Sequence, residues 1–160
     1  MEEVKRYTEE EAHLMFAKQT NARVWALLEK QQRTQADDEE MLHAAHTSLF
    51  HWLYAGKPVN HQRGEWMIAR VHTLLGNANE ALRHAERCLQ LTEQYRGEMA
   101  DFDLAFAEEC AARAYALAGD VPIAIKHLRQ AEQIGDSIAD TEDREVFFQE
   151  LNGGLWYGLR

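Results

Sequence analysis

The chain contains few of the residues that interrupt helices or cross-link small folds. Among its 160 residues there are two prolines, nine glycines and two cysteines. With so few prolines, long stretches are free to be helical, and two cysteines do not make a disulfide framework. Because Cys88 and Cys110 each lie in a helical pattern among small residues, we expect reduced, packed thiols in a cytoplasmic protein. A reactive or metal-bound thiol is the alternative.

The sequence also lacks positive charge and long apolar runs. Seventeen basic residues stand against 27 acidic ones, which gives a net charge of −10. Such a surface repels nucleic acids and anionic membranes over most of its area. No apolar run approaches the length of about 18 residues that a membrane span needs, and the start, MEEVKRYTEEEAH, has no apolar signal region. We therefore expect a cytoplasmic protein that binds neither nucleic acid nor membrane, and no cofactor motif is recognisable.

What the sequence has in abundance is helical periodicity. Apolar residues recur at helical spacing over almost the whole chain, and no strand-like alternation competes with them. The breaks carry residues that begin or end helices. Thr8 and Glu11 form a capping-box pattern, and Gly76 and Gly119 follow helical stretches. The sequence therefore predicts an all-α fold of about seven helices.

A repeat of 43 residues organises these helices. The stretch ARVHTLLGN at 69–77 returns as ARAYALAGD at 112–120. At this shift, identical residues coincide along a whole helix–turn–helix unit: Glu65/Glu108, Ala69/Ala112, Arg70/Arg113, Leu74/Leu117, Gly76/Gly119, Ala81/Ala124, His84/His127 and Gln90/Gln133. Because such units bury their apolar faces only by stacking on one another, the repeat predicts stacked antiparallel helical hairpins.

We interpret residues 1–160 as a single helical-repeat domain. Its second helix starts about 40 residues before the fourth, so the first two helices form an earlier, degenerate copy of the unit. The predicted parts are a degenerate hairpin at about 8–55, repeats at about 61–95 and about 101–135, a capping helix at about 142–151 and an apolar tail at 153–160.

Two resemblances accompany this reading. The turn glycines Gly76 and Gly119, the small residues Ala69 and Ala81, and the aromatic Tyr115 resemble positions of the tetratricopeptide repeat. That resemblance implies a concave groove lined by the first helix of each hairpin. The segments AAHTSLFHW, PVNHQRGEW, HAERCL and DFDLAFAEE are also similar to a family of small bacterial proteins of unassigned function.

Candidate binding residues lie on the first helices of the two repeats. At 100° per residue, Arg63, Trp66 and Arg70 lie within about 60° of arc on one helix face. An aromatic floor with guanidinium groups suits a carboxylate, a peptide C-terminus or a phosphate. Arg113 has a carboxylate four residues earlier, whereas Arg70 has none in local reach, so a structural polar network is the alternative for this face. The candidate groove residues are Arg63, Trp66, Arg70, Phe106, Glu109 and Arg113.

The second helix carries a possible metal site. His43 and His46 are three residues apart, so they can share an ion if a third ligand comes from elsewhere. His72, His84, Glu108 and Glu109 can supply that ligand only if packing brings one of them close. Solvated histidines are the alternative, since no HExxH or CxxC motif is present.

The functional hypothesis is a protein or peptide interaction module whose groove binds an acidic or carboxylate-bearing partner. One alternative is a metal- or small-molecule-binding helical protein, and another is a self-associating structural protein that forms a homodimer through its tail. The tail, LNGGLWYGLR, is too apolar to stay solvated, so it either folds back, docks on a second copy or serves as a binding peptide. No nucleophile with its partners is recognisable, so we do not expect an enzyme.

Overall fold

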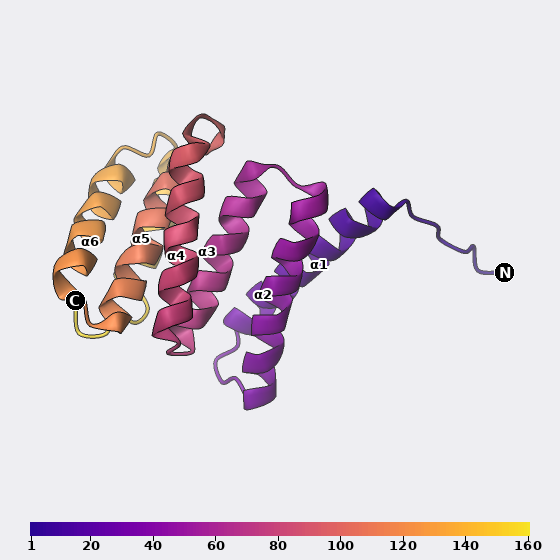
Figure 1. Cartoon of the computed structure of the whole chain (residues 1–160), viewed down its shortest axis with the longest axis horizontal. Coiled ribbons are helices and arrows are strands. Elements are labelled where there is room, and N and C mark those ends of the chain that lie inside the picture. Colours follow the sequence, from indigo (N-terminus) through magenta and orange to yellow (C-terminus); the bar gives the residue numbers. More distant parts are fainter.

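The computed structural model covers residues 1–160 and contains seven α-helices, one 3₁₀ turn and no strand, which confirms the all-α prediction. Figure 1 shows the second to the sixth helix side by side in one row, with the first helix lying across the second and the residues before it extending away. The helices are α1 (Glu9–Leu28), α2 (Gln35–Ala55), α3 (Pro58–Leu74), α4 (Ala78–Gln94), α5 (Asp101–Ala118), α6 (Val121–Asp136) and α7 (Thr141–Asn152), and the 3₁₀ turn is Arg96–Glu98.

Consecutive helices pair into three hairpins, α1 with α2, α3 with α4 and α5 with α6. Neighbouring hairpins contact each other through α2 and α3 and through α4 and α5, and α7 packs on α5 and α6. The starts of α2, α4 and α6 are each 43 residues apart, and so are those of α3 and α5. The 43-residue repeat of the sequence is therefore also a repeat of helix boundaries.

The two repeats end their first helix with the same turn. Gly76 and Gly119 both have left-handed backbone conformations, with φ of 78° and 83°. In each turn the N–H that follows the glycine donates to the carbonyl five residues earlier, at 2.9 Å and 3.0 Å. Glycine adopts this conformation without the steric cost that a Cβ brings. The recurrence of glycine in the two turns thus has a backbone cause.

Small residues let the helices of the repeats approach closely. Ala69 and Ala81 of the α3–α4 hairpin are both 0% exposed, and so are the equivalent Ala112 and Ala124 of the α5–α6 hairpin. Larger side chains fill the two ends of the row, where α1 to α3 form one apolar cluster and α5 to α7 with the C-terminal segment form another.

The two cysteines belong to this interior. Cys88 and Cys110 are buried and free, and burial raises the pKa of both thiols. Neither thiol is therefore ionised near neutral pH, and both serve as packing residues, as the sequence pattern predicted.

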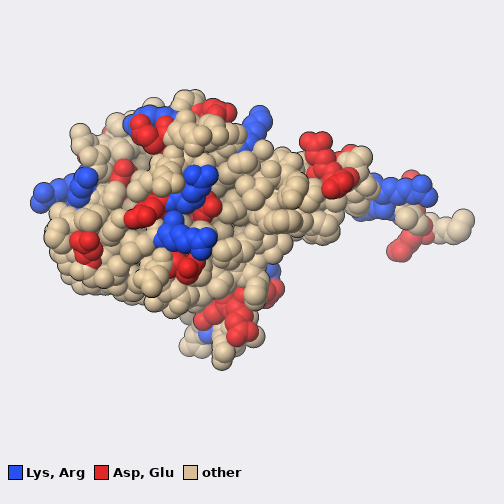
Figure 2. Space-filling model, viewed as in Figure 1, with Lys and Arg blue, Asp and Glu red and all other residues tan.

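The surface carries charges of both signs. Figure 2 shows basic and acidic side chains interspersed over the face that α4 presents, while acidic side chains gather at the tip where α1 turns into α2. None of the helices combines the length and the apolarity that crossing a membrane requires.

Candidate functional site

An open groove crosses one side of the helix row. It has a volume of about 420 Å³ and takes its walls from α1, α3, α5 and α7. The first helices of all three hairpins therefore contribute to it, together with the last helix. The residues that line it are Asn21, Trp25, Gln62, Arg63, Trp66, Met67, Phe102, Asp103, Phe106, Val146 and Glu150.

Aromatic rings from three helices form a continuous floor in this groove. Trp25 of α1 stacks on Trp66 of α3 with ring centroids 6.0 Å apart, and Trp66 meets Phe106 of α5 edge-on at 5.8 Å. Two apolar groove residues remain substantially exposed, Trp25 at 40% and Val146 at 49%. The groove thus presents apolar area that the chain itself leaves uncovered.

Arg63 lies on the rim of the groove and is held by one ion pair. Its Nε and Nη2 donate to the two carboxylate oxygens of Asp103, at 2.8 Å and 3.0 Å. Asp103 also accepts the Ala100 N–H at 2.9 Å, which caps the start of α5. The carboxylate is 4% exposed, whereas the Arg63 side chain is 48% exposed. Asp103 therefore neutralises much of the charge of Arg63 while leaving part of the guanidinium accessible.

Arg70 has a carboxylate partner outside its own helix. Its Nη2 donates to Glu150 Oε2 at 3.0 Å, and its guanidinium lies 5.4 Å from the centroid of Trp66. This pair fits the alternative of a structural polar network, because α7 packs against α5 and brings Glu150 within reach. Glu150 follows Arg70 by 80 residues, so no local pattern indicates this pair.

Arg113 and Glu109 lie beneath the C-terminal segment rather than in the open groove. Arg113 pairs with Glu109, as the spacing predicted, and the two residues are 8% and 1% exposed. Burial raises the pKa of Glu109, and the neighbouring Arg113 opposes that rise. Of the six predicted groove residues, only Arg63, Trp66 and Phe106 therefore line the open groove. Arg70 lines the cavity beneath the tail together with Glu109 and Arg113.

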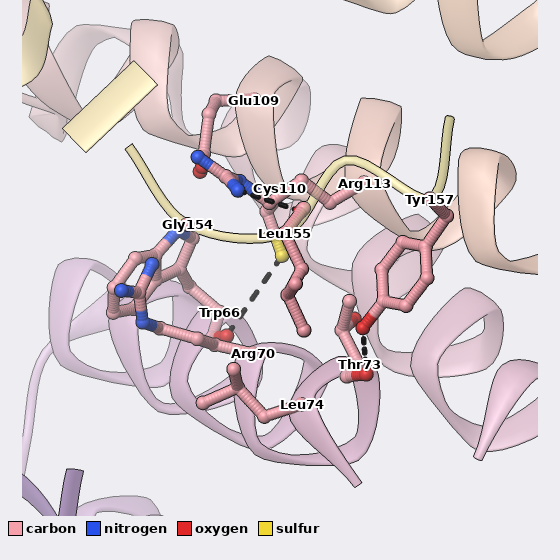
Figure 3. Close-up of a pocket in the computed structure, with 10 residues that line it drawn as sticks. All are labelled: Trp66, Arg70, Thr73, Leu74, Glu109, Cys110, Arg113, Gly154, Leu155 and Tyr157. Atoms are coloured by element: carbon pink, nitrogen blue, oxygen red, sulfur yellow. Dashed lines mark hydrogen bonds and ion pairs between the residues drawn. The ribbon is translucent and has the colours of Figure 1, made fainter. Parts of the chain in front are cut away.

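The apolar tail folds back onto its own hairpins. Arg113 donates from Nη1 to the Leu155 carbonyl at 2.8 Å and from Nη2 to the carbonyls of Glu150 and Gly153, at 2.7 Å and 2.9 Å. Its guanidinium lies 4.1 Å from the ring centroid of Trp156. Figure 3 shows the tail passing over Arg113, and the cavity left beneath it measures about 40 Å³.

Two further contacts hold the tail. The Trp156 ring is 6% exposed and its N–H donates to the Leu151 carbonyl at 2.9 Å. The hydroxyl of Tyr157 donates to the Thr73 carbonyl at 2.6 Å, which ties the tail to α3 as well. The tail therefore covers the junction of α3 and α5 next to the open groove.

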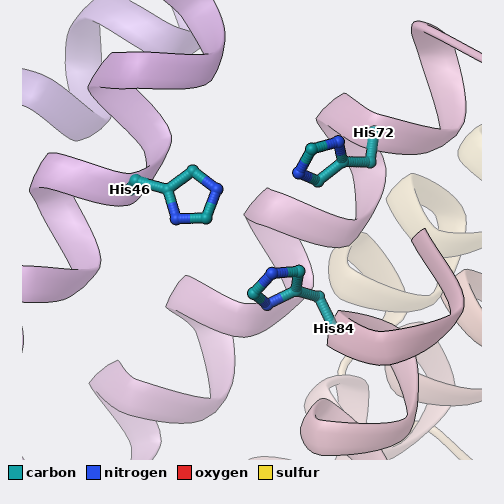
Figure 4. A group of neighbouring side chains, drawn as sticks. All are labelled: His46, His72 and His84. Carbon is teal, nitrogen blue, oxygen red and sulfur yellow. The ribbon is translucent and has the colours of Figure 1, made fainter. Parts of the chain in front are cut away.

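A histidine cluster lies where α2, α3 and α4 meet. His46, His72 and His84 each offer a ring nitrogen, and these atoms all lie within 4.8 Å of one another. Figure 4 shows the three rings facing a common space. Burial, followed by the neighbouring imidazole of His84, lowers the pKa of both His46 and His72. His43, the other predicted candidate, does not belong to this cluster, so the convergence involves His46 alone among the histidines of α2.

A histidine–carboxylate pair recurs between the helices of both repeats. His84 Nδ1 lies 2.6 Å from Glu65 Oε2, and His127 Nδ1 lies 2.5 Å from Glu108 Oε2. These four residues are equivalent at the 43-residue shift. The pairs join the first to the second helix of each hairpin, which gives the recurrence of these residues a structural cause.

Comparisons of the chain with protein-family models, with curated proteins and with solved structures gave no match. The fold and the groove define the class of protein: an all-α stack of three helical hairpins with a capping helix and an open, aromatic-floored groove.

Proposed function

We propose that the chain is a cytoplasmic interaction module that binds a short peptide segment in the groove formed by α1, α3, α5 and α7. The observation that carries this proposal is the uncovered aromatic floor made by Trp25, Trp66 and Phe106. An apolar side chain of the partner fills this floor and removes exposed aromatic area from water. The tetratricopeptide resemblance supports the same use of the first helices.

The charges at the rim favour a partner with an acidic group. Arg63 uses Nε and Nη2 for Asp103, so its Nη1 is left to meet a carboxylate of the peptide. Because the Arg63 side chain is 48% exposed, this contact is accessible without breaking the pair with Asp103. The bound carboxylate contributes orientation more than affinity, since exposed ion pairs contribute about 1 kcal/mol or less.

The tail supports the proposal by showing how the same framework holds an extended apolar segment. Arg113 is equivalent to Arg70 at the 43-residue shift, and it binds three main-chain carbonyls and the ring of Trp156. An arginine at this position of a first helix is therefore able to hold peptide backbone and an aromatic side chain together. The open groove lies beside this bound segment.

A peptide selection tests the proposal. Random peptides displayed on phage are selected against the full chain, and enriched peptides are measured by calorimetry against three variants. Val146→Arg blocks the groove and Trp25→Ala removes part of its floor, while Phe50→Ala removes an exposed aromatic residue outside it. We expect the two groove variants to weaken binding about tenfold or more, equivalent to about 1.4 kcal/mol, and Phe50→Ala to leave it unchanged.

Two results would overturn this function. One is the absence of any enriched peptide, and the other is equal binding of enriched peptides by the wild type and Val146→Arg. Arg63→Gln serves as the test of the acidic preference, because it keeps hydrogen-bonding capacity and removes charge. It is expected to weaken only those peptides that contain a carboxylate.

A further inference from the structure

The histidine cluster at the junction of α2, α3 and α4 lies away from the groove, and the proposed peptide binding does not use it. His46, His72 and His84 come from three helices and two hairpins. Their ring centroids are 5.4 to 5.9 Å apart in every pairing. Three imidazoles therefore converge from residues up to 38 positions apart, an arrangement that α-helical periodicity does not produce by itself.

Two of the ring nitrogens in the cluster lack hydrogen-bond partners within the chain. The Nε2 atoms of His72 and His84 are buried and make no hydrogen bond, in residues that are 5% and 9% exposed. Buried polar atoms are nearly always paired, because leaving one unpaired costs roughly 1 to 3 kcal/mol. Two such atoms in one cluster point to a shared ligand that accepts nitrogen lone pairs.

A second set of residues orients the rings. The carboxylate of Glu65 lies 2.6 Å from His84 Nδ1 and accepts its N–H, which leaves Nε2 of the same ring with its lone pair free. Asn77 Nδ2 lies 3.2 Å from His72 Nδ1. A flip of this amide exchanges its nitrogen and oxygen, so that the oxygen accepts the Nδ1–H and Nε2 of His72 is left to bind the ion. Carboxylate and amide partners of this kind accompany metal-binding histidines and increase their basicity.

We propose that His46, His72 and His84 bind a divalent transition-metal ion, with Zn²⁺ as the ion that best fits three imidazoles. Three nitrogens about 2.1 Å from a tetrahedral ion lie about 3.4 Å from one another. Ligand atoms that already lie within 4.8 Å of one another reach this geometry by shifts on the order of 1 Å.

The fourth position of the ion lies toward Glu80 and the solvent. Glu80 Oε2 lies 3.7 Å from His84 Nε2, so a carboxylate oxygen is near the ligand atoms. His46 is exposed, which opens the same side to water. The fourth ligand is therefore either this carboxylate or a water molecule.

The junction of α4, α5 and α6 provides an internal comparison, because it is equivalent to the junction of α2, α3 and α4 at the 43-residue shift. It keeps the pair of His127 and Glu108, but residues of other types stand at the remaining equivalent positions. At the 43-residue shift His46 becomes Leu89, His72 becomes Tyr115 and Glu80 becomes Ile123. Because this equivalent junction packs with Leu89 and Tyr115, the stacking of the hairpins does not itself require histidines at positions 46 and 72.

Metal titration of the untagged full chain tests the proposal. After treatment with a chelator, the protein is titrated with Co²⁺ while its visible absorption is recorded, and Zn²⁺ is then added as a competitor. We expect saturation at one ion per chain and displacement by Zn²⁺. His46→Leu and His72→Tyr install the residue types of the equivalent junction, Leu89 and Tyr115, and each is expected to weaken Co²⁺ binding at least about 100-fold.

Matched variants separate this site from other histidines. His43→Ala removes an exposed neighbour on α2, and His51→Ala removes one member of a two-histidine contact in which His13 Nδ1 and His51 Nδ1 are 2.8 Å apart. Both are expected to bind Co²⁺ as the wild type does. Glu65→Gln is expected to weaken binding about 10- to 100-fold, whereas the equivalent Glu108→Gln leaves it unchanged.

Three outcomes would reject the metal site: no saturable Co²⁺ binding by the wild type, wild-type binding by His46→Leu, or loss of binding in His51→Ala instead. Circular dichroism of each variant verifies folding. His46→Leu is decisive because this side chain is exposed, so the substitution leaves the core intact.

Discussion

The hairpins α3–α4 and α5–α6 share one backbone arrangement and differ in the contacts that their equivalent side chains make. Both end their first helix with a left-handed glycine, and both join their helices with a histidine–carboxylate pair. At equivalent arginines they diverge, because Arg70 pairs with one exposed carboxylate while Arg113 is buried under the tail. The comparison shows that identical residues in a repeat acquire different roles from the helix that packs next to them.

The largest expected difference between the repeats concerns these two arginines. Arg113→Ala leaves the buried carboxylate of Glu109 without its partner and releases two carbonyls of the tail and one of α7, so it should lower the free energy of unfolding by about 3 to 5 kcal/mol. Arg70→Ala removes a half-exposed pair with Glu150 and should cost below about 1 kcal/mol. Urea denaturation of both variants measures the difference. Equal losses would show that the tail contributes nothing to the role of Arg113.

The second prediction compares the bound tail with the open groove. Trp156 is 6% exposed, so Trp156→Ala should lower the free energy of unfolding by about 3 kcal/mol or more. Trp25 is 40% exposed in the groove, so Trp25→Ala should lower the free energy of unfolding clearly less than Trp156→Ala. Thermal unfolding reports both values, and sedimentation shows whether the solution mass stays constant. A tail that belongs to its own stack predicts no change of mass in Trp156→Ala.

The third prediction concerns the turn glycines, whose replacement should lower the free energy of unfolding by similar amounts in the two repeats. Gly76→Ala and Gly119→Ala each place a Cβ on a left-handed residue, although no neighbouring atom lies within 4 Å of that Cβ. The cost is therefore backbone strain alone, about 1 to 2 kcal/mol for each variant. Chemical denaturation should give similar losses for the two turns. A large inequality would mean that one turn contributes contacts beyond its backbone conformation.

The smallest expected effect concerns the pKa of Tyr115, the residue equivalent to His72 at the 43-residue shift. The hydroxyl of Tyr115 donates to Glu86 at 2.6 Å, and this hydrogen bond, together with burial, raises the pKa of Tyr115 to about 12. Since the folded-state pKa is raised, the stability this group contributes is present at neutral pH and is lost as the pH rises through that value. Glu86→Gln should lower the pKa of Tyr115, which ultraviolet difference titration against Tyr115→Phe measures. An unchanged titration would remove Glu86 as the cause.

Much of the fold was predictable because its signals are local. Apolar spacing, the capping residues at Thr8 and the turn glycines each act within a few residues of the chain, and the helices form where these signals indicate. The start of α3 at Pro58, three residues before the expected His61, reflects how readily proline occupies a first helical turn. The pair of Arg113 with Glu109 was predictable for the same reason, because the two residues are four positions apart in one helix.

The candidate sites were predictable only in part, because their members come from different helices. Trp66 and Phe106 were identified from the repeat, but Trp25 and Val146 complete the groove only through the packing of α1 and α7. His46 was identified on α2, but its neighbour in sequence, His43, was the wrong companion. The direction in which His72 and His84 point depends on how two hairpins stack, and no spacing within one helix reports that.

The sequence by itself determined the number of helices, the turns between them and the 43-residue period, since these depend on backbone preferences and on apolar faces of single helices. The tertiary structure decided which arginine is open and which is covered, where the tail docks, and which histidines meet. Those contacts join residues tens of positions apart. They depend on the relative placement of rigid helices, which is fixed only when the hairpins stack.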